Sequence, residues 1–268
     1  MKRVDKSFPC PQTLTKYAQD HPDSTWEDMR SDNPNGSQAA RECRDRTVQD
    51  QRGLCAYCEQ KISAEDSLRC RIEHFHPKSD TSETRNWSLD WKNMLAVCDG
   101  GSRTSGEQPV VHPLPENLSC DAHKNRMIQT GKLSVACEGH LLNPLEIPAF
   151  PNLFALDKGT GYIKPDETSC AAVNIHGNAC DTTTELVGRT IEILNLNCER
   201  LAEKRRILVV DIDQNKKRLR EKGVLPAEMP GKLVSRYFNA KWPEFFTTIR
   251  CCLGHTAEAY LQSVNYQG

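Results

Sequence analysis

The sequence contains no long apolar run. Its 268 residues are 37% hydrophobic and 26% charged, and no stretch reaches the roughly 18 apolar residues that a membrane-spanning helix needs. The N-terminal sequence MKRVDKSFPC has basic residues but lacks the apolar core of a signal peptide. These absences exclude a transmembrane helix and predict a soluble globular protein of the cytoplasm.

The chain also lacks net charge and a nucleotide-binding loop. Its formal net charge is −1, so it does not have the positive field expected of an autonomous nucleic-acid-binding protein. Lysine and arginine gather at 204–206 and at 216–220, where a solvated helix face is the simpler interpretation. No G-x-x-x-x-G-K-[ST] loop occurs. Any ATP hydrolysis linked to this protein must therefore come from a partner.

Cysteine, in contrast, is abundant. The chain has 13 cysteines, and in a reducing compartment most are expected to be small buried apolar side chains. Cys55 and Cys58 in CAYC are the exception, because thiolates at this spacing suit adjacent corners of a tetrahedral zinc site, although redox motifs share the spacing.

Two further cysteines, Cys98 and Cys120, lie downstream. The segment between them is rich in glycine, proline and serine and is typical of an inserted loop. We therefore predict one structural zinc site formed by the thiolates of Cys55, Cys58, Cys98 and Cys120. One alternative is that the two downstream cysteines are unrelated residues that only pack in the interior. Another is that a histidine replaces one cysteine as the fourth ligand. The candidates for that position are His112, His123 and His140.

A short segment between the cysteine pairs concentrates groups that suit catalysis. RIEHFHPKS, residues 71–79, places Glu73, His74, His76 and Lys78 close together. Such charges are costly to bury unless they are paired or bound to a metal. A neutral histidine can act as a general base near neutral pH, and we assign this role to His74. His76 and Lys78 are expected to contact phosphate or solvent.

The order of these motifs resembles that of the HNH, or His-Me finger, endonucleases. Over about residues 50–131 the chain has C-x-x-C, then Glu73-His74, then Asn93, and then Cys120 at the start of a helical segment that contains a lysine. The resemblance implies an α+β fold in which a ββα-metal module with a structural zinc site is embedded in a mostly helical chain.

The resemblance also implies roles for the site residues. Glu73 and Asp121 are expected to bind a catalytic Mg²⁺ or Mn²⁺, because oxygen ligands favour hard cations. His74 would activate water, and Asn93 would orient the region around His74. The family usually has asparagine or histidine at the position of Asp121, so His123 is the alternative second ligand. Because neighbouring side chains alternate along a strand, a twist or bend is expected to bring Glu73 and His74 to one site.

Longer segments resemble a narrower group. GLCAYCEQKI, IEHFHPKS, NPLEIPAFPNLFALDKGTGYIKP and TIEILNLNCERLAEKR are similar to the HNH nuclease subunit of Septu-type and retron-associated antiphage systems. The resemblance implies metal-dependent hydrolysis of DNA, or of RNA such as tRNA, in a complex with an ABC-type ATPase. In a retron, a reverse transcriptase and its RNA–DNA product are further partners. The alternative is a zinc-stapled interaction module without catalysis, against which the intact Glu73, His74 and Asn93 argue.

Three regions are expected along the chain. Residues 1–36 are expected to form a polar N-terminal arm, in which HPDSTWEDMRSDNPNG is a loop or an ordered arm. Residues 37–131 form the nuclease module. Residues 132–268 are expected to be irregular and then helical and to bind a partner, mainly through 183–268 with some contact from the 1–36 arm. NLFAL and GYIKP are expected to be short strands. Helical periodicity begins at TTTELVGRTIEILNL, and a long helix is expected to end at Gly223. Two further helices are expected in GKLVSRYFNAKWPEFFTTIRCCLG and HTAEAYLQSV, with Pro243 at a start or a break.

Overall fold

The computed structural model describes residues 1–82, 84–103, 111–239 and 242–268. It combines many helices with two small antiparallel sheets, β1–β2 and β3–β4. The helices are α1 (Gln12–Asp20), α2 (Trp26–Ser31), α3 (Asn35–Asp50), η1 (Trp91–Asn93, a 3-10 helix), α5 (Cys120–Gln129), α6 (Glu167–Ala171), α7 (Thr183–Ile193), α8 (Glu199–Glu221), α9 (Met229–Phe238), α10 (Phe246–Leu253) and α11 (His255–Ser263). The strands are β1 (Cys70–His74), β2 (Met94–Cys98), β3 (Phe154–Leu156) and β4 (Ile163–Pro165).

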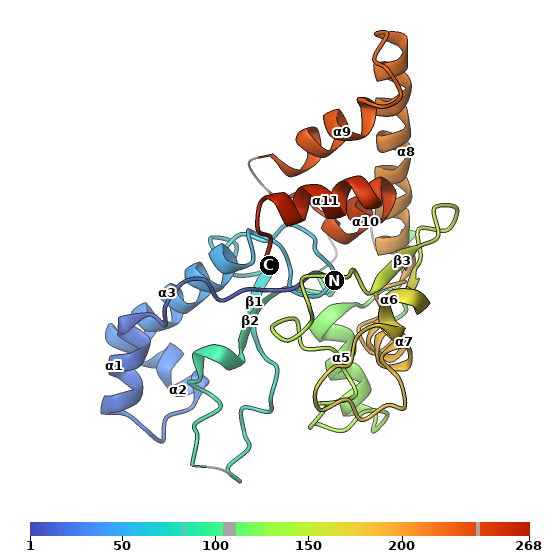
Figure 1. Ribbon diagram of the computed structural model, residues 1–268. Coiled ribbons are helices and arrows are strands. Elements are labelled where there is room, and N and C mark those ends of the chain that lie inside the picture. The colour runs from blue at the N-terminus through green and yellow to red at the C-terminus, as the bar shows by residue number, and fades with distance from the viewer. Residues whose placement is uncertain (83, 104–110, 240–241) are drawn as a thin grey trace.

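The β1–β2 pair lies at the centre of the molecule (Figure 1). Its register pairs Cys70 with Cys98 and His74 with Met94. Every residue of β2 is buried, since α3 and α5 both pack against this strand. Two strands and a helix therefore follow one another in the order β1, β2, α5. The glycine- and proline-rich segment between β2 and α5 includes residues 104–110, which lie outside the described residues.

The segment HPDSTWEDMRSDNPNG, expected to be a loop or an ordered arm, contains the short helix α2. The Thr25 hydroxyl accepts the N–H of Asp28, whose carboxylate accepts the N–H of Thr25, so α2 begins with a capping box. Trp26 and Met29 are buried in one apolar cluster with Trp91. Isolated helices of this length are marginal in water, so tertiary packing stabilises α2 in a way that local periodicity does not reveal.

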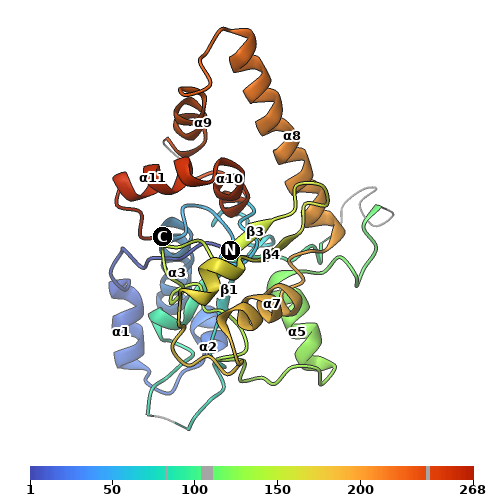
Figure 2. The same ribbon diagram turned by 45° about the vertical axis from the view of Figure 1, so that its right-hand side comes forward.

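The C-terminal half matches its expected elements closely. The two short strands form β3–β4. The helix α8 ends at Glu221, two residues before the predicted Gly223. Gly223 has a φ of 73°, and the Val224 N–H after it donates to the Leu219 carbonyl, which closes the end of the helix. The segment around Pro243 separates two helices, α9 and α10. In both views α8 projects from the body of the molecule with α9 beside it (Figures 1 and 2).

One hydrophobic core joins the predicted nuclease module to the C-terminal region. Tyr57 and Leu95 belong to the same buried cluster as Leu186, Leu194 and Leu201. The site-bearing strands are therefore supported by residues from far along the chain. Within the described ranges, none of the helices has the length and apolar character needed to span a membrane.

Candidate metal centre and active site

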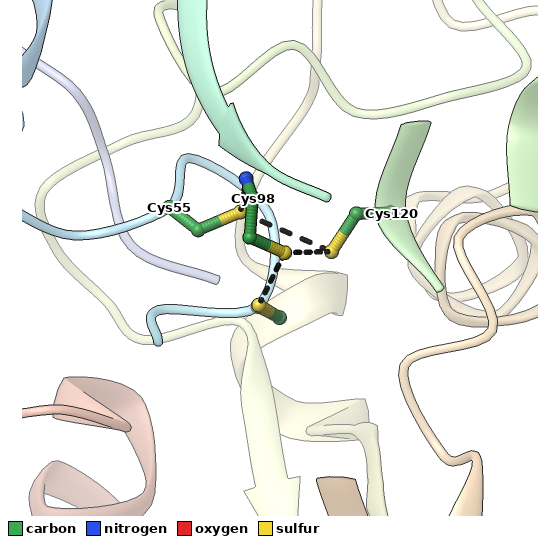
Figure 3. Close-up of side chains that lie close together, drawn as sticks. Cys55, Cys98 and Cys120 are labelled. Carbon is green, nitrogen blue, oxygen red and sulfur yellow. Dashed lines mark hydrogen bonds between the residues drawn. The ribbon is translucent and has the colours of Figure 1, made fainter. Parts of the chain in front are cut away.

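Four buried cysteines meet at one end of the β1–β2–α5 unit. Cys55 and Cys58 lie in the turn between α3 and β1, Cys98 ends β2, and Cys120 begins α5. Their Sγ atoms all lie within 4.8 Å of one another. Figure 3 shows the sulfur atoms of Cys55, Cys98 and Cys120 directed toward one another. The structure thus brings together the four cysteines that the sequence predicts as one ligand set.

The sulfur–sulfur distances indicate the kind of site. They are 3.6 Å for Cys58–Cys98, 3.7 Å for Cys98–Cys120 and 3.9 Å for Cys55–Cys120. A disulfide would require about 2.05 Å. A tetrahedron with zinc–sulfur bonds of about 2.3 Å has edges of about 3.8 Å. The four thiols are therefore spaced as the corners of a tetrahedral metal site.

Backbone and side-chain groups around the four cysteines suit thiolates. The N–H of Cys98 points at the Sγ of Cys55 at 3.3 Å, and the N–H of Gly100 points at the Sγ of Cys98 at 3.4 Å. Gly100 has a φ of 65°, and a Cβ there would lie 2.2 Å from the carbonyl oxygen of Ser119, so only glycine fits this turn. Donors of this kind stabilise negative charge on sulfur.

A buried arginine from α8 supports the same centre. Arg200 donates through Nη1 to Oε1 of Gln60 and through Nη2 to the hydroxyl of Ser119, both at 2.8 Å. The Ser119 hydroxyl lies 3.7 Å from the Sγ of Cys120. A divalent metal with four thiolates carries a net charge of −2, and a buried guanidinium beside it reduces the cost of burying that charge.

The three histidines considered as alternative ligands are not members of the cysteine group. His112 lies 3.1 Å from the Glu203 carboxylate. His123 makes a 2.8 Å bond through Nδ1 with the carbonyl of Ile193. The Nδ1 atom of His140 is buried without a hydrogen-bond partner among the described residues.

Glu73 on β1 and Asp121 on α5 form a buried acidic pair. They are 8% and 7% exposed, and the adjacent Lys124 is 4% exposed. The ammonium of Lys124 contacts Oε1 of Glu73, while Asn125 donates to Oδ1 of Asp121 at 2.9 Å. Burial, followed by the charge of Asp121, raises the pKa of Glu73 to about 8. Two carboxylates this close need a compensating cation, and their oxygens suit a hard divalent ion.

His74 is held in one tautomer. Its Nε2 lies 2.9 Å from the carbonyl oxygen of Ser88, and since a carbonyl only accepts, Nε2 carries the proton and Nδ1 keeps its lone pair. The ring packs edge-on against Trp26, with the centroids 5.4 Å apart. Burial lowers the pKa of His74 to about 4. A neutral imidazole with a free Nδ1 can accept a proton from water.

Glu73 and His74 contact different elements. Glu73 meets Lys124 of α5, whereas His74 packs on Trp26 of α2. The alternation of a regular strand is therefore retained, and the bend expected from the sequence is not seen. The positive charge of Lys124 still lowers the pKa of His74, so the acidic pair and the histidine share one electrostatic environment.

Asn93 fixes the loop that follows β1. Its Oδ1 accepts the N–H of His76 at 2.7 Å, and its Nδ2 donates to the carbonyls of His76 and Trp87, both at 3.0 Å. These hydrogen bonds from Asn93 therefore fix the backbone two residues beyond His74. The His76 ring is itself held between Asp80 at 2.8 Å and Glu138 at 2.6 Å, instead of facing solvent.

The sequence alone does not predict several residues that contact the site. Ser88 and Glu138 carry no local signal, because each reaches the site only through the folding of a loop. Arg200 lies in a segment whose sequence is typical of the first turn of a helix, so nothing in it indicates a contact with the cysteines. The sequence motif includes Lys124, but it does not predict the contact of Lys124 with Glu73. Lys78, expected to face phosphate or solvent, contacts Glu27.

Comparison with known proteins gives one informative relative. Over 211 residues the chain is 36% identical to a retron Ec83 protein of Escherichia coli that is named as an HNH endonuclease. The matched segment covers 78% of this chain and 79% of that protein. No protein-family model matches the chain.

Proposed function

The chain belongs to the family of retron-associated HNH endonucleases, and we propose that it hydrolyses phosphodiester bonds at a site formed by Glu73, His74, Asn93 and Asp121. The observation that carries this assignment is a neutral, tautomer-fixed histidine that directly follows, on β1, a glutamate of the buried carboxylate pair. The first two strands and α5 would then be the ββα-metal module of the family, within an α+β fold.

Each residue has a separate task in this proposal. The Nδ1 atom of His74 accepts the proton of the attacking water, while Ser88 holds the ring through Nε2. Asn93 keeps the loop after His74 in place through the backbone of His76. A Mg²⁺ or Mn²⁺ ion held by Glu73 and Asp121 would supply positive charge at the scissile phosphate. Lys124 contacts Glu73 and partly balances the charge of the carboxylate pair.

We also propose that Cys55, Cys58, Cys98 and Cys120 hold a structural zinc ion. The four thiolates leave no open coordination position, as is usual where zinc has a structural task. The ion would tie the turn after α3, the end of β2 and the start of α5 to one point. The catalytic metal would then be held by the carboxylate pair and not by the cysteines.

The biological setting is proposed from the family. The chain would be the effector of an antiphage system in the cytoplasm, working with an ABC-type ATPase and, in a retron, with a reverse transcriptase and its RNA–DNA product. Residues 1–36 would be an N-terminal segment, 37–131 the nuclease module and 132–268 the partner-binding region. A net charge of −1 supports dependence on a partner for capture of the substrate.

Cleavage assays test the proposal directly. Purified chain, with and without the ATPase, is incubated with DNA and with tRNA in Mg²⁺ or Mn²⁺ and in EDTA. We expect metal-dependent internal cleavage that His74→Ala removes. If no nucleic acid is cut in any combination, the chain is instead a zinc-stapled interaction module that has lost catalysis.

A further inference from the structure

A wide groove lies away from the cysteine centre, between the segment that precedes β1 and the C-terminal helices. Its volume is about 1050 Å³. Arg52, Lys61 and Arg69 line the groove from the segment before β1, which is called the first wall below. Trp242 and Tyr260 line it from the C-terminal region, which is called the second wall. The two walls come from the predicted nuclease module and from the last helical region.

The first wall carries an excess of positive charge. Among the described residues no ion-pair partner is found for Arg52 or Lys61, and the Arg69 side chain, 63% exposed, is 3.9 Å from Asp66. Asp66 is the one acidic residue among the described residues that line the groove. The chain as a whole has a net charge of −1, so this wall is a local departure that favours an anionic ligand.

The second wall is aromatic and rigid. Trp242 packs edge-to-face on Phe246, with the ring centroids 4.8 Å apart at 90°, and on Tyr266 at 5.5 Å. Trp242 and Tyr260 are only partly buried, so both rings can contact a ligand in the groove. Packing from behind holds Trp242 in place, and little entropy is lost when a second ring stacks on it.

A groove lined both by positive side chains and by aromatic rings matches one class of ligand. Single-stranded nucleic acid presents phosphates and unstacked bases together, and proteins bind it with cations along the backbone and aromatic platforms under the bases. A duplex hides its base faces and would use only the cations. An acidic peptide would satisfy the charges but would not require flat rings.

We propose that this groove is a binding site for single-stranded nucleic acid, separate from the catalytic residues. Arg69 directly precedes β1, and at about 3.3 Å per residue it lies roughly 13 Å along the chain from Glu73. A strand held in the groove can therefore extend a few nucleotides toward the carboxylate pair. This inference rests on the proposed nuclease function and adds how the substrate is captured.

Binding is measured by fluorescence anisotropy with labelled oligothymidylate and oligouridylate, using full-length His74→Ala protein so that the probe is not cut. The double variant Arg52→Ala/Lys61→Ala should weaken binding and lower the salt slope by about 1.4, since each phosphate contact contributes about 0.7 for a single strand. Trp242→Ala should weaken binding about 10-fold. The control Lys217→Ala/Lys222→Ala removes the same charge from the far end of α8.

Two results would refute the proposal that this groove binds single-stranded nucleic acid. One is unchanged oligonucleotide affinity in the Arg52→Ala/Lys61→Ala variant, whose exposed positions do not endanger folding. The other is a duplex that binds as tightly as the single strands and with the same sensitivity to Trp242→Ala. Cleavage by the chain with native His74 is assayed in parallel. If the wild-type chain cleaves nucleic acid but the groove variants bind oligonucleotides normally, only the groove proposal is refuted. If the wild-type chain does not cleave, the nuclease proposal is refuted.

Discussion

At the residue scale, two neighbours in the sequence acquire opposite electrostatic properties. Burial disfavours the charged form of any side chain, so it raises the pKa of a carboxylic acid and lowers that of an imidazole. The pKa of Glu73 accordingly rises to about 8, and that of His74 falls to about 4. Glu73 therefore needs a neighbouring cation to remain a carboxylate near neutral pH. His74 is neutral there, although its lower pKa also makes the imidazole a weaker base.

The first prediction concerns the general base. His74→Ala should reduce the cleavage rate by about 100- to 10,000-fold, the usual contribution of general-base catalysis. The variant should still fold and keep its zinc, because Cys98 pairs with Cys70 at the opposite end of the strand pair from His74. Its melting temperature should fall modestly, because the ring contact with Trp26 and the bond to Ser88 are lost. His176→Ala, at an exposed histidine, is the matched control and should cleave at the normal rate. Retention of more than a few per cent of activity in His74→Ala would refute the assignment.

The second prediction separates the two candidates for the second metal ligand. Asp121 lies beside Glu73 and completes the carboxylate pair, whereas His123 bonds through Nδ1 to the Ile193 carbonyl and could bind a metal only through Nε2. Asp121→Ala should therefore raise the Mn²⁺ concentration that gives half-maximal cleavage by at least about 10-fold, as loss of a ligand does, while His123→Ala should change it little. Asp121→Asn, which restores a side chain typical of the family, should keep substantial activity. The reverse order of effects would make His123 the ligand.

At the element scale, the cysteine centre joins three segments that also contribute to the main hydrophobic core. The turn with Cys55 and Cys58, the end of β2 at Cys98 and the start of α5 at Cys120 converge on it. Cys120 has a φ of 55°, an uncommon conformation for a residue other than glycine. The cysteine centre therefore fixes the orientation of α5 relative to β1 and, with it, the distance between Asp121 and β1.

The third prediction tests whether the cysteine centre holds a structural zinc ion. The purified chain should contain about one tightly bound zinc ion, as expected for a closed four-thiolate site. Cys98→Ser should lose zinc and become sensitive to proteolysis, since metal binding contributes directly to folding in such modules. Cys180→Ser, at a partly exposed cysteine outside the group, is the control. Full zinc content in Cys120→Ser would show that a different residue supplies the fourth ligand.

At the scale of the whole molecule, the nuclease module and the C-terminal region share one core. Removal of all residues after about 182 would expose Leu95 and Tyr57, so a truncated chain is unsuited to mapping a partner surface. The projecting helix α8 offers a better probe. Its residues Ile207 and Val210 are 63% and 54% exposed and, three positions apart, lie on one face of the helix.

The fourth prediction uses this face. Ile207→Asp with Val210→Asp should abolish co-purification of the chain with the ABC-type ATPase, because charges in the centre of an interface are costly to desolvate. The melting temperature should be unaffected, as both side chains are exposed. Leu68→Asp, at an apolar residue that is 56% exposed outside the C-terminal region, is the control. Undiminished binding by the α8 variant would place the interface elsewhere, and no binding by the wild-type chain would refute the ATPase partnership.

Residue types and their spacing were enough to predict the cysteine set, the pairing of Glu73 with His74 in one motif and the long helix α8. Thiol chemistry, a charged segment in a buried context and helical periodicity are properties of the chain itself, so they can be read without coordinates. The family resemblance added Asn93 and Asp121 as candidates. These parts of the site depend on which residues are present and in what order.

Only the tertiary structure decided which groups meet. The contact of Lys124 with Glu73, the carbonyl of Ser88 on His74, and the Asn93 bonds to the backbone of His76 all join segments that are apart in sequence. The helix α2 and the groove beside Trp242 likewise exist because distant elements pack together. Such contacts depend on loop closure and on packing, which no local pattern of side chains encodes.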